Sequence, residues 1–401
     1  MLFSSLVFLF TFLPITLLVY YLVPRKVKNV VLLIASLIFY AWGEPVYIFL
    51  MLISILFNYF CGMDIALKAG RKSQVRSLIF TIVVNLFILG FFKYYGFIVT
   101  NLNAILPFYI PYRKLELPIG ISFYTFQTLS YIIDVYRGNV DVQVNLIDFG
   151  TYVTMFPQLI AGPIVQYADV ERQLRERKES LTKFGYGAWF FVMGLAKKVL
   201  LANTIGSIYE NIAAMDGMSV VTAWLGCLAY TFQIYFDFSG YSDMAVGLGK
   251  MFGFEFMQNF NYPYISKSVT EFWRRWHISL GSWFREYVYI PLGGNRKGFV
   301  KQCRNILIVF LLSGFWHGAS WNFVVWGLIH GIYMVGAICL SQIRKDKKRI
   351  LHPVAGWILT LLLVNIAWVF FRAPSLIGAW RILQQPFVNP LGLSLIHISE
   401  P

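Results

Sequence analysis

Two tryptophan–histidine pairs are the residues of this chain best suited to chemistry. Trp316-His317 lies within Ser313–Gly318, and His277 of the pair Trp276-His277 lies forty positions before His317. A histidine titrates near neutral pH, so its imidazole can accept or donate a proton under physiological conditions. An ionisable side chain inside a membrane segment is costly and is usually present for catalysis or transport. His317, which follows an apolar run, is therefore the first candidate for a catalytic base.

The composition predicts an all-α polytopic membrane protein. Of the 401 residues, 58% are hydrophobic and only 13% are charged, which is more apolar surface than a soluble monomer normally tolerates. Aromatic residues reach 18%, as expected for a helix bundle with Tyr and Trp at the level of the lipid headgroups. The four cysteines are scattered without metal-ligand spacing, so we expect no metal site.

Apolar runs predict about nine spanning helices, with short re-entrant and interfacial helices around a central cavity. A helix needs ~20 apolar residues to cross a bilayer, so some runs span and others do not. Asn305–Trp316 has only twelve residues, which would leave His317 near the middle of the membrane. Phe149–Val165 contains Pro157 and Pro163 and is predicted to be broken or re-entrant. The remaining runs are Met1–Val23, Val30–Trp42, Val46–Met63, Leu78–Val99, Ile119–Val135, Ala188–Leu201, Thr222–Phe238, Trp321–Leu340 and Val354–Phe371.

The basic residues predict the orientation. Most of the 34 Lys and Arg residues fall in five segments that an alternating topology places on one side of the membrane. By the positive-inside rule that side is the cytoplasm, so the N-terminus lies outside a cell membrane, inner or plasma. The net charge of +15 then reflects topology and contact with membrane lipid, and we expect no nucleic-acid partner.

A cluster of carboxylates supplies further candidate residues. Asp237, Ser239 and Asp243 lie at the end of one apolar run. They are supporting candidates that could orient a histidine or pair with Arg274 and Arg275. Helix capping of the following segment explains them equally well.

The stretch from Asn259 to Arg296 is both aromatic and basic, which predicts amphipathic helices in the cytoplasmic interface. It leads into the turn Pro291–Lys297, whose backbone N–H groups and cations suit an anionic donor. A plain turn explains Gly293-Gly294 equally well. His330, inside an apolar run, fits a hydrogen-bonded core histidine better than a functional one. The candidate donor-binding residues are Arg274, Arg275, Asn295, Arg296 and Lys297.

Seven motifs follow one another along the chain: Phe39–Pro45, Pro118–Gln127, Met155–Pro163, Asp237–Asp243, Glu271–Leu280, Tyr289–Arg296 and Phe315–Gly318. In this order they resemble the membrane-bound O-acyltransferases, and among them the bacterial branch of the alginate O-acetyltransferase membrane subunit. The resemblance covers roughly residues 1–380, which predicts a single membrane domain of this type. Residues 381–401, ending in Leu395–Pro401, resemble no terminus of the family and are expected to be a truncation or foreign sequence.

This resemblance implies a function. The family's essential histidine falls on His317 and its second polar position on His277. The expected reaction transfers an acyl group, in the acetyltransferase branch an acetyl group, from a cytoplasmic thioester such as acetyl-CoA to hydroxyls of an extracytoplasmic polysaccharide. No bound cofactor is implied, and an extracytoplasmic acetyltransferase is the expected protein partner. D-alanyl transfer to teichoic acid stays open as the alternative, and the acceptor is alginate, peptidoglycan, teichoic acid or another exopolysaccharide.

The chemistry of this transfer is compatible with the residues. A neutral histidine that removes the hydroxyl proton contributes ~10²–10⁴-fold to the rate. No serine or cysteine is convincingly paired with a histidine, so we expect direct transfer rather than a covalent intermediate. A polytopic transporter is the competing class, since carriers also use broken helices and mid-membrane polar groups. The sequence shows no repeat of its polar motifs, which favours the enzyme, and a purely structural scaffold would leave both histidines unexplained.

Overall fold

The structure is a computed structural model that describes residues 1–113, 115–160, 162–215, 219–343 and 352–388, and within these residues every regular element is a helix. The predicted all-α polytopic class is confirmed. Seven described helices are long and apolar enough to cross a membrane, fewer than the nine expected. The runs Met1–Val23, Ile119–Val135 and Thr222–Phe238 yield no candidate span, whereas the helix that ends at His317 is long enough to be one. The seven candidate spans are Arg25–Gly43, Ile48–Leu67, Arg71–Ile105, Leu181–Ala213, Phe299–His317, Trp321–Gln342 and Pro353–Arg372.

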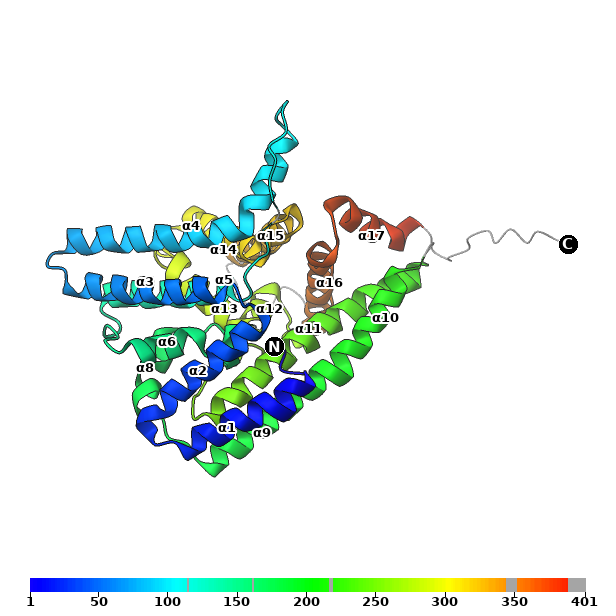
Figure 1. Ribbon diagram of the computed structural model, residues 1–401. Helices are drawn as coiled ribbons and strands as arrows, with labels where there is room; N and C mark the ends of the chain where they lie inside the picture. Colours follow the sequence, from blue (N-terminus) through cyan, green and yellow to red (C-terminus); the bar gives the residue numbers. More distant parts are fainter. Residues whose placement is uncertain (114, 161, 216–218, 344–351, 389–401) are drawn as a thin grey trace. The chain divides into compact units, whose positions relative to one another are not determined.

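The chain divides into two compact units. The first comprises Met1–Leu195 and Tyr241–Asn259, and the second comprises Ala196–Gly240 and Phe260–Pro401. Three boundaries separate them: one at the end of α9 (Leu181–Ala196), one inside α11 (Val220–Met251), and one between Asn259 and Phe260, outside any helix (Figure 1). The final residues 389–401 of the tail predicted to be atypical lie outside the described residues.

Helices α3 and α4 of the first unit are joined by a buried amide pair. The side chains of Asn58 and Asn85 each donate to the other, at 3.1 and 2.9 Å. Such polar pairs satisfy groups that a membrane environment cannot solvate. The helices of this unit are η1 (Phe8–Phe12), α1 (Leu13–Leu22), α2 (Arg25–Gly43), α3 (Ile48–Leu67), α4 (Arg71–Asn103), α5 (Ile121–Arg137), α6 (Leu146–Thr154), α7 (Phe156–Leu159), α8 (Tyr167–Glu176) and α9 (Leu181–Ala196).

The predicted break near Pro157 is confirmed. Helix α6 ends at Thr154, and the four-residue helix α7 follows after Met155. The backbone N–H of Phe156, released by this break, donates to the hydroxyl of Ser36 on α2 at 3.0 Å. A buried helix end is tolerated only when such a partner is present, so α2 stabilises the broken segment.

Short helices alternate with spans in the second unit. Three of them, α12, α13 and η4, follow one another closely and precede the α14–α15 hairpin. The helices are η2 (Lys197–Ala202), α10 (Asn203–Ala213), η3 (Pro263–Ile265), α12 (Val269–Arg275), α13 (Ile278–Phe284), η4 (Arg285–Tyr289), α14 (Phe299–His317), α15 (Trp321–Ile343), α16 (Pro353–Arg372) and α17 (Leu376–Val388).

The predicted length of the helix before His317 was wrong. α14 begins at Phe299 rather than Asn305 and has 19 residues, or ~28 Å at 1.5 Å per residue. The polar residues Lys301 and Arg304 have good helix propensity and extend the apolar run, which hydropathy alone could not reveal. His317 is therefore the last residue of a helix of spanning length, and a short helix no longer argues for a mid-membrane position.

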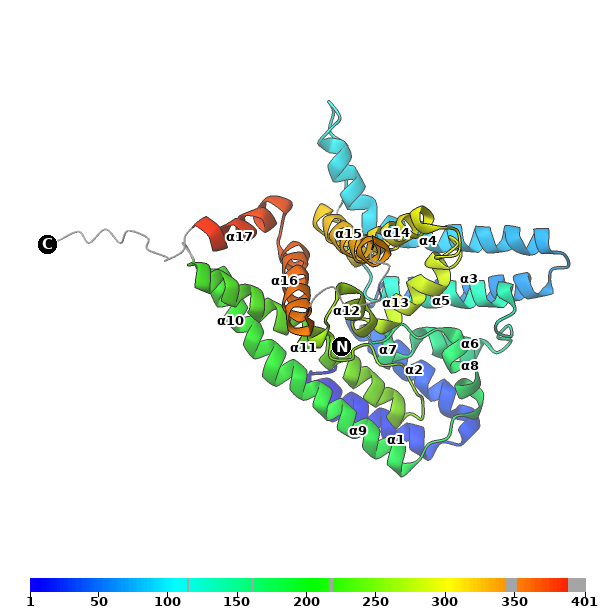
Figure 2. The same cartoon turned by 180° about the vertical axis from the view of Figure 1, so that it is seen from behind.

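Glycines bring α14 and α15 into close contact. A Cβ atom on Gly314 would lie 2.3 Å from the carbonyl oxygen of Phe323, and one on Gly327 would lie 2.4 Å from that of Phe310. Only the absence of side chains allows the two backbones to approach this closely, as is typical of membrane helix pairs. The two helices lie side by side in both views of Figures 1 and 2, and this hairpin fixes the position of His317.

Candidate active site

His277 occupies the junction between α12 and α13 in a left-handed backbone conformation, with φ 46° and ψ 55°. This conformation is uncommon for a residue other than glycine and is often found at functional sites. The side chain is only 2% exposed, and neither ring nitrogen has a hydrogen-bond partner among the described residues. Burial lowers the pKa of His277 to about 3, so the imidazole is neutral near pH 7.

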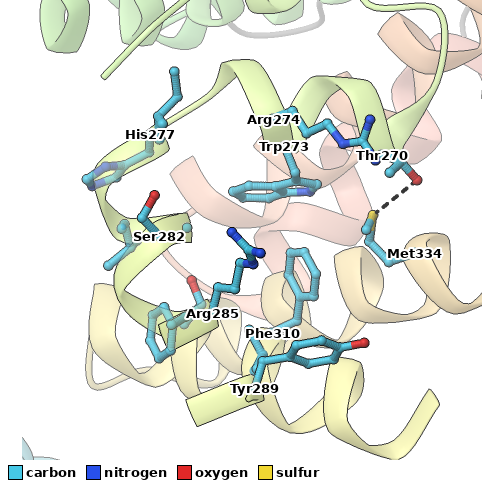
Figure 3. A pocket seen from close by; sticks show the side chains of 15 residues that line it. Thr270, Trp273, Arg274, His277, Ser282, Arg285, Tyr289, Phe310 and Met334 are labelled. Atoms are coloured by element: carbon cyan, nitrogen blue, oxygen red, sulfur yellow. Dashed lines mark hydrogen bonds between the residues drawn. The ribbon is translucent and has the colours of Figure 1, made fainter. Parts of the chain in front are cut away.

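A pocket of about 390 Å³ opens beside His277 (Figure 3). Its walls come from α12, α13, η4, α14 and α15, all within the second unit. The guanidinium of Arg285 points into the pocket beneath the ring of Trp273, and the side chain of Arg274 lies at its upper edge. A neutral imidazole and two cations therefore line one cavity, an arrangement suited to polarising or holding an anionic group.

Aromatic rings surround both candidate histidines. The ring of His277 lies 4.7 Å from that of Phe238 and 6.0 Å from that of Trp316. The ring of His317 lies 5.0 Å from Trp316 and 4.9 Å from Trp326, with Phe371 at 5.1 Å. Trp316 thus contacts both histidines, and the structure brings them to the same aromatic cluster although His317 does not line the pocket.

His330 is a fully buried residue of the same cluster. Its Nδ1 accepts a hydrogen bond from the indole N–H of Trp273 at 3.3 Å, and its ring lies 5.0 Å from that of Trp326. This tryptophan bond assigns the ring proton to Nε2. The contacts agree with the interpretation of His330 as a hydrogen-bonded core histidine, and they also fix the ring of Trp273 against the pocket.

The capping interpretation of the carboxylate cluster is wrong. Asp237, Ser239 and Asp243 all lie inside the continuous helix α11, where they begin no new helix. The carboxylate of Asp237 forms an ion pair with Lys198 rather than with either predicted arginine, while Asp243 belongs to the first unit. Ser239 is 1% exposed, and its hydroxyl has no partner within the described chain.

The predicted donor-binding residues do not all converge. Arg274 lines the pocket, whereas Arg275 is held by the carboxylate of Glu271 at 3.0 Å and by the carbonyl oxygen of Asn261. In the turn after η4, the side-chain amide of Asn305 donates to the carbonyl oxygens of Leu292 and Gly294. This turn presents the exposed side chains of Asn295, Arg296 and Lys297, none of which lines the pocket.

Arg285 is a pocket residue that sequence reasoning missed. It begins the π-helical turn η4, and Tyr289 at the end of this turn also lines the cavity. Such turns occur often at functional sites. A spacing of four residues within a predicted interfacial helix is the one sequence signal that could have placed Arg285 and Tyr289 on a common face.

Comparisons with known proteins identify the family of the chain. Residues 34–373 match the model of the MBOAT, membrane-bound O-acyltransferase family. The chain is 47% identical over 394 residues to a protein of Pseudomonas aeruginosa named as a probable alginate O-acetylase, AlgI, covering 96% of this chain and 75% of the relative. It is 36% identical over 433 residues to the peptidoglycan O-acetyltransferase of Helicobacter pylori, covering 100% of this chain and 82% of that protein.

A more distant match is the teichoic acid D-alanyltransferase of Bacillus subtilis, 29% identical over 267 residues, or 63% of this chain and 66% of the relative. The family match extends over all three elements that carry His277 and His317, namely α12, α13 and α14. The chain therefore belongs to the membrane-bound O-acyltransferase family and is a multi-pass membrane enzyme of that class.

Proposed function

We propose that this enzyme transfers an acetyl group from a thioester donor to hydroxyl groups of an extracytoplasmic polysaccharide. The observation that carries the proposal is the 47% identity to an alginate O-acetylase over 96% of the chain. The peptidoglycan O-acetyltransferase, which the whole chain matches, supports the same acyl group and a different polysaccharide. D-alanyl transfer is the alternative, with weaker support from a relative that matches 63% of the chain.

His317 is the proposed general base. One of its ring nitrogens takes the proton of the acceptor hydroxyl as the hydroxyl oxygen attacks the thioester carbonyl carbon. The C–S bond then breaks, and the thiolate leaves with that proton. His317 lies in the last turn of α14, where the helix dipole stabilises a positive charge by ~0.3–1 kcal/mol. This position supports a histidine that becomes cationic in the transition state.

His277 has a different proposed role. Burial holds its imidazole neutral, so one ring nitrogen carries a proton and can donate a hydrogen bond. We assign it to the oxyanion that develops on the thioester carbonyl. A hydrogen-bond donor held in a site that excludes water stabilises such an oxyanion more strongly than water does. Loss of one donor typically lowers the rate ~10²–10³-fold.

The proposed donor is acetyl-CoA or a similar thioester, a substrate rather than a bound cofactor. Arg274 and Arg285 are the cations that line the pocket, and guanidinium groups suit phosphate oxygens. Asn295, Arg296 and Lys297 are exposed and would meet a phosphate only outside the pocket. Arg275 is the weakest of the predicted donor ligands because Glu271 already engages it.

The proposed setting is the inner or plasma membrane, with the N-terminus outside. This orientation is supported by the basic segments, which an alternating topology places on one face. An extracytoplasmic acetyltransferase is the proposed protein partner, because the acceptor lies across the membrane from the thioester. In this proposal the thioester donor enters from the cytoplasmic face of the protein, and the polysaccharide acceptor binds at the opposite face.

Replacement of His317 with Gln tests the proposal. The amide cannot act as a base, so acetylation of the polysaccharide is expected to fall at least 10²-fold while abundance and thermal unfolding stay near those of wild type. His352→Gln is the matched control for the loss of an imidazole, since His352 is an exposed histidine at the start of α16 that does not line the pocket beside His277, and it is expected to lower transfer far less than His317→Gln. Wild-type transfer by the His317→Gln protein would refute the assignment of the base.

A further inference from the structure

A second and larger cavity lies within the second unit, next to the first and also against α12. Its volume is about 1060 Å³, and it shares Thr270 and Arg274 with the pocket beside His277. Three groups of residues form its walls: Asn261, Lys267–Glu271, Arg274 and Arg275 on the α12 side, the last turns of α15, and the first turns of α16. We call it the α15–α16 cavity.

The α15 and α16 walls are apolar and open toward the surface. Both helices are candidate membrane spans, yet the side chains of Ile332, Leu340 and Leu359 that line the cavity are 54%, 52% and 45% exposed. A Cβ atom on Gly336 would meet nothing within 4 Å, so this wall has open space in front of it. An apolar opening on spanning helices faces lipid chains, which fill it more favourably than water.

The α12 wall is polar and carries a positive charge. Lys267 and Arg274 are both exposed, and neither forms an ion pair within the part of the chain that the structure describes. The carboxylate of Glu271 is already held by Arg275 at 3.0 Å and by the backbone N–H of Lys267 at 3.0 Å. Arg275 is the cation that pairs directly with Glu271, while Lys267 feels this carboxylate only at longer range, so the ammonium of Lys267 and the guanidinium of Arg274 can still contact an anion.

We propose that the α15–α16 cavity binds one anionic phospholipid. Its acyl chains lie along the apolar walls of α15 and α16, and its phosphate accepts hydrogen bonds from Lys267 and Arg274. Charge complementarity favours an anionic headgroup. Each Lys or Arg near a membrane surface contributes ~1 kcal/mol to the binding of acidic lipid. The lateral apolar opening selects a molecule with hydrocarbon chains over a water-soluble phosphate.

The shared residue Arg274 connects this lipid to the active-site pocket. A phosphate bound to Arg274 from the α15–α16 cavity would hold its guanidinium at the wall that the two cavities share. The lipid would then act as a fixed part of the enzyme, positioning a cation that faces the donor.

Lipid retention by the purified full chain tests this proposal without reference to acyl transfer. The protein is titrated with phosphatidylglycerol or phosphatidylcholine in detergent, and native mass spectrometry counts the retained molecules. Wild type is expected to keep one phosphatidylglycerol under conditions that remove phosphatidylcholine. Gly336→Leu should fill the apolar wall and weaken retention about tenfold or more, whereas Gly90→Leu, at an equally open glycine of α4, should not.

Lys267→Gln tests the contribution of charge to lipid binding separately from the fit of the acyl chains against the apolar wall. This variant should lower the preference for phosphatidylglycerol over phosphatidylcholine about tenfold, as expected for the loss of one charge-assisted contact, while Lys301→Gln, at an exposed lysine of α14, should not. Equal retention by Gly336→Leu and Gly90→Leu would overturn the proposal. Displacement of the lipid by acetyl-CoA, one molecule for one, would assign the cavity to the donor and also overturn it.

Discussion

Gly327→Ala provides a direct test of how the α14–α15 hairpin positions His317. The new Cβ would lie 2.4 Å from the carbonyl oxygen of Phe310 and 3.2 Å from Cα of Gly314. Both are backbone atoms, which cannot rotate away, so the helices must move apart by several tenths of an ångström or more. Overpacking of this kind costs ~1–3 kcal/mol.

Gly336→Ala is the matched control on the same helix. Each substitution gains the same ~1 kcal/mol of helix propensity, and Gly336 has nothing within 4 Å of its added Cβ. The difference between the two variants therefore isolates the packing cost of ~1–3 kcal/mol. Thermal unfolding in detergent should show Gly327→Ala at a clearly lower midpoint than Gly336→Ala.

Activity should follow the same order. Gly314 lies less than one turn before His317, so separation of the helices displaces the proposed base. A misplacement of ~1 Å can cost ~10²-fold in rate. We expect acetyl transfer by Gly327→Ala to be ~10–100-fold lower than that by Gly336→Ala. Equal midpoints and equal rates for both variants would refute the conclusion that this contact positions His317.

Three further outcomes are expected. Because burial lowers the pKa of His277 from 6.5 to about 3, the folded protein resists a proton that the unfolded chain binds. This contribution to stability is present above pH 6.5 and falls by ~1 kcal/mol at pH 5.5, so thermal unfolding should show a smaller loss of stability on acidification for His277→Asn than for wild type. Arg285→Glu should weaken binding of acetyl-CoA in a titration far more than Arg296→Glu, since only Arg285 lines the pocket; equal effects would move the donor to the Pro291–Lys297 turn. A cysteine at Lys72, in a chain without its native cysteines, should resist an impermeant reagent in intact cells, and labelling there would reverse the orientation.

The sequence was sufficient for features that depend on local chemistry. Pro157 predicted the break between α6 and α7, because proline removes a helical donor wherever the chain folds. The Trp-His pairs marked His277 and His317 as candidate residues, and the structure brings both rings close to that of Trp316. The roles assigned to the two histidines stay predictions that the variants above address.

Features that depend on tertiary partners were beyond the sequence. The ion pair of Asp237 with Lys198 joins α11 to η2, and no spacing rule relates residues on separate helices. The start of α14 was misplaced because hydropathy records where a helix is apolar, while helix propensity and the turn at Gly298 decide where it begins. Arg285 was overlooked among many cations, since only the fold shows which of them faces a cavity.

The two histidines are held in place by different physical means, and the difference matches their proposed roles. His277 is fixed by its backbone: a left-handed residue between two short helices persists only where the surroundings hold it, and burial then keeps its ring neutral. His317 is fixed by side-chain contacts with Trp316, Trp326 and Phe371 at the end of a helix whose terminal carbonyls favour a cation. A rigid neutral donor suits a developing oxyanion, and a histidine whose cationic form is stabilised suits the base, so the division of roles follows from where each helix ends.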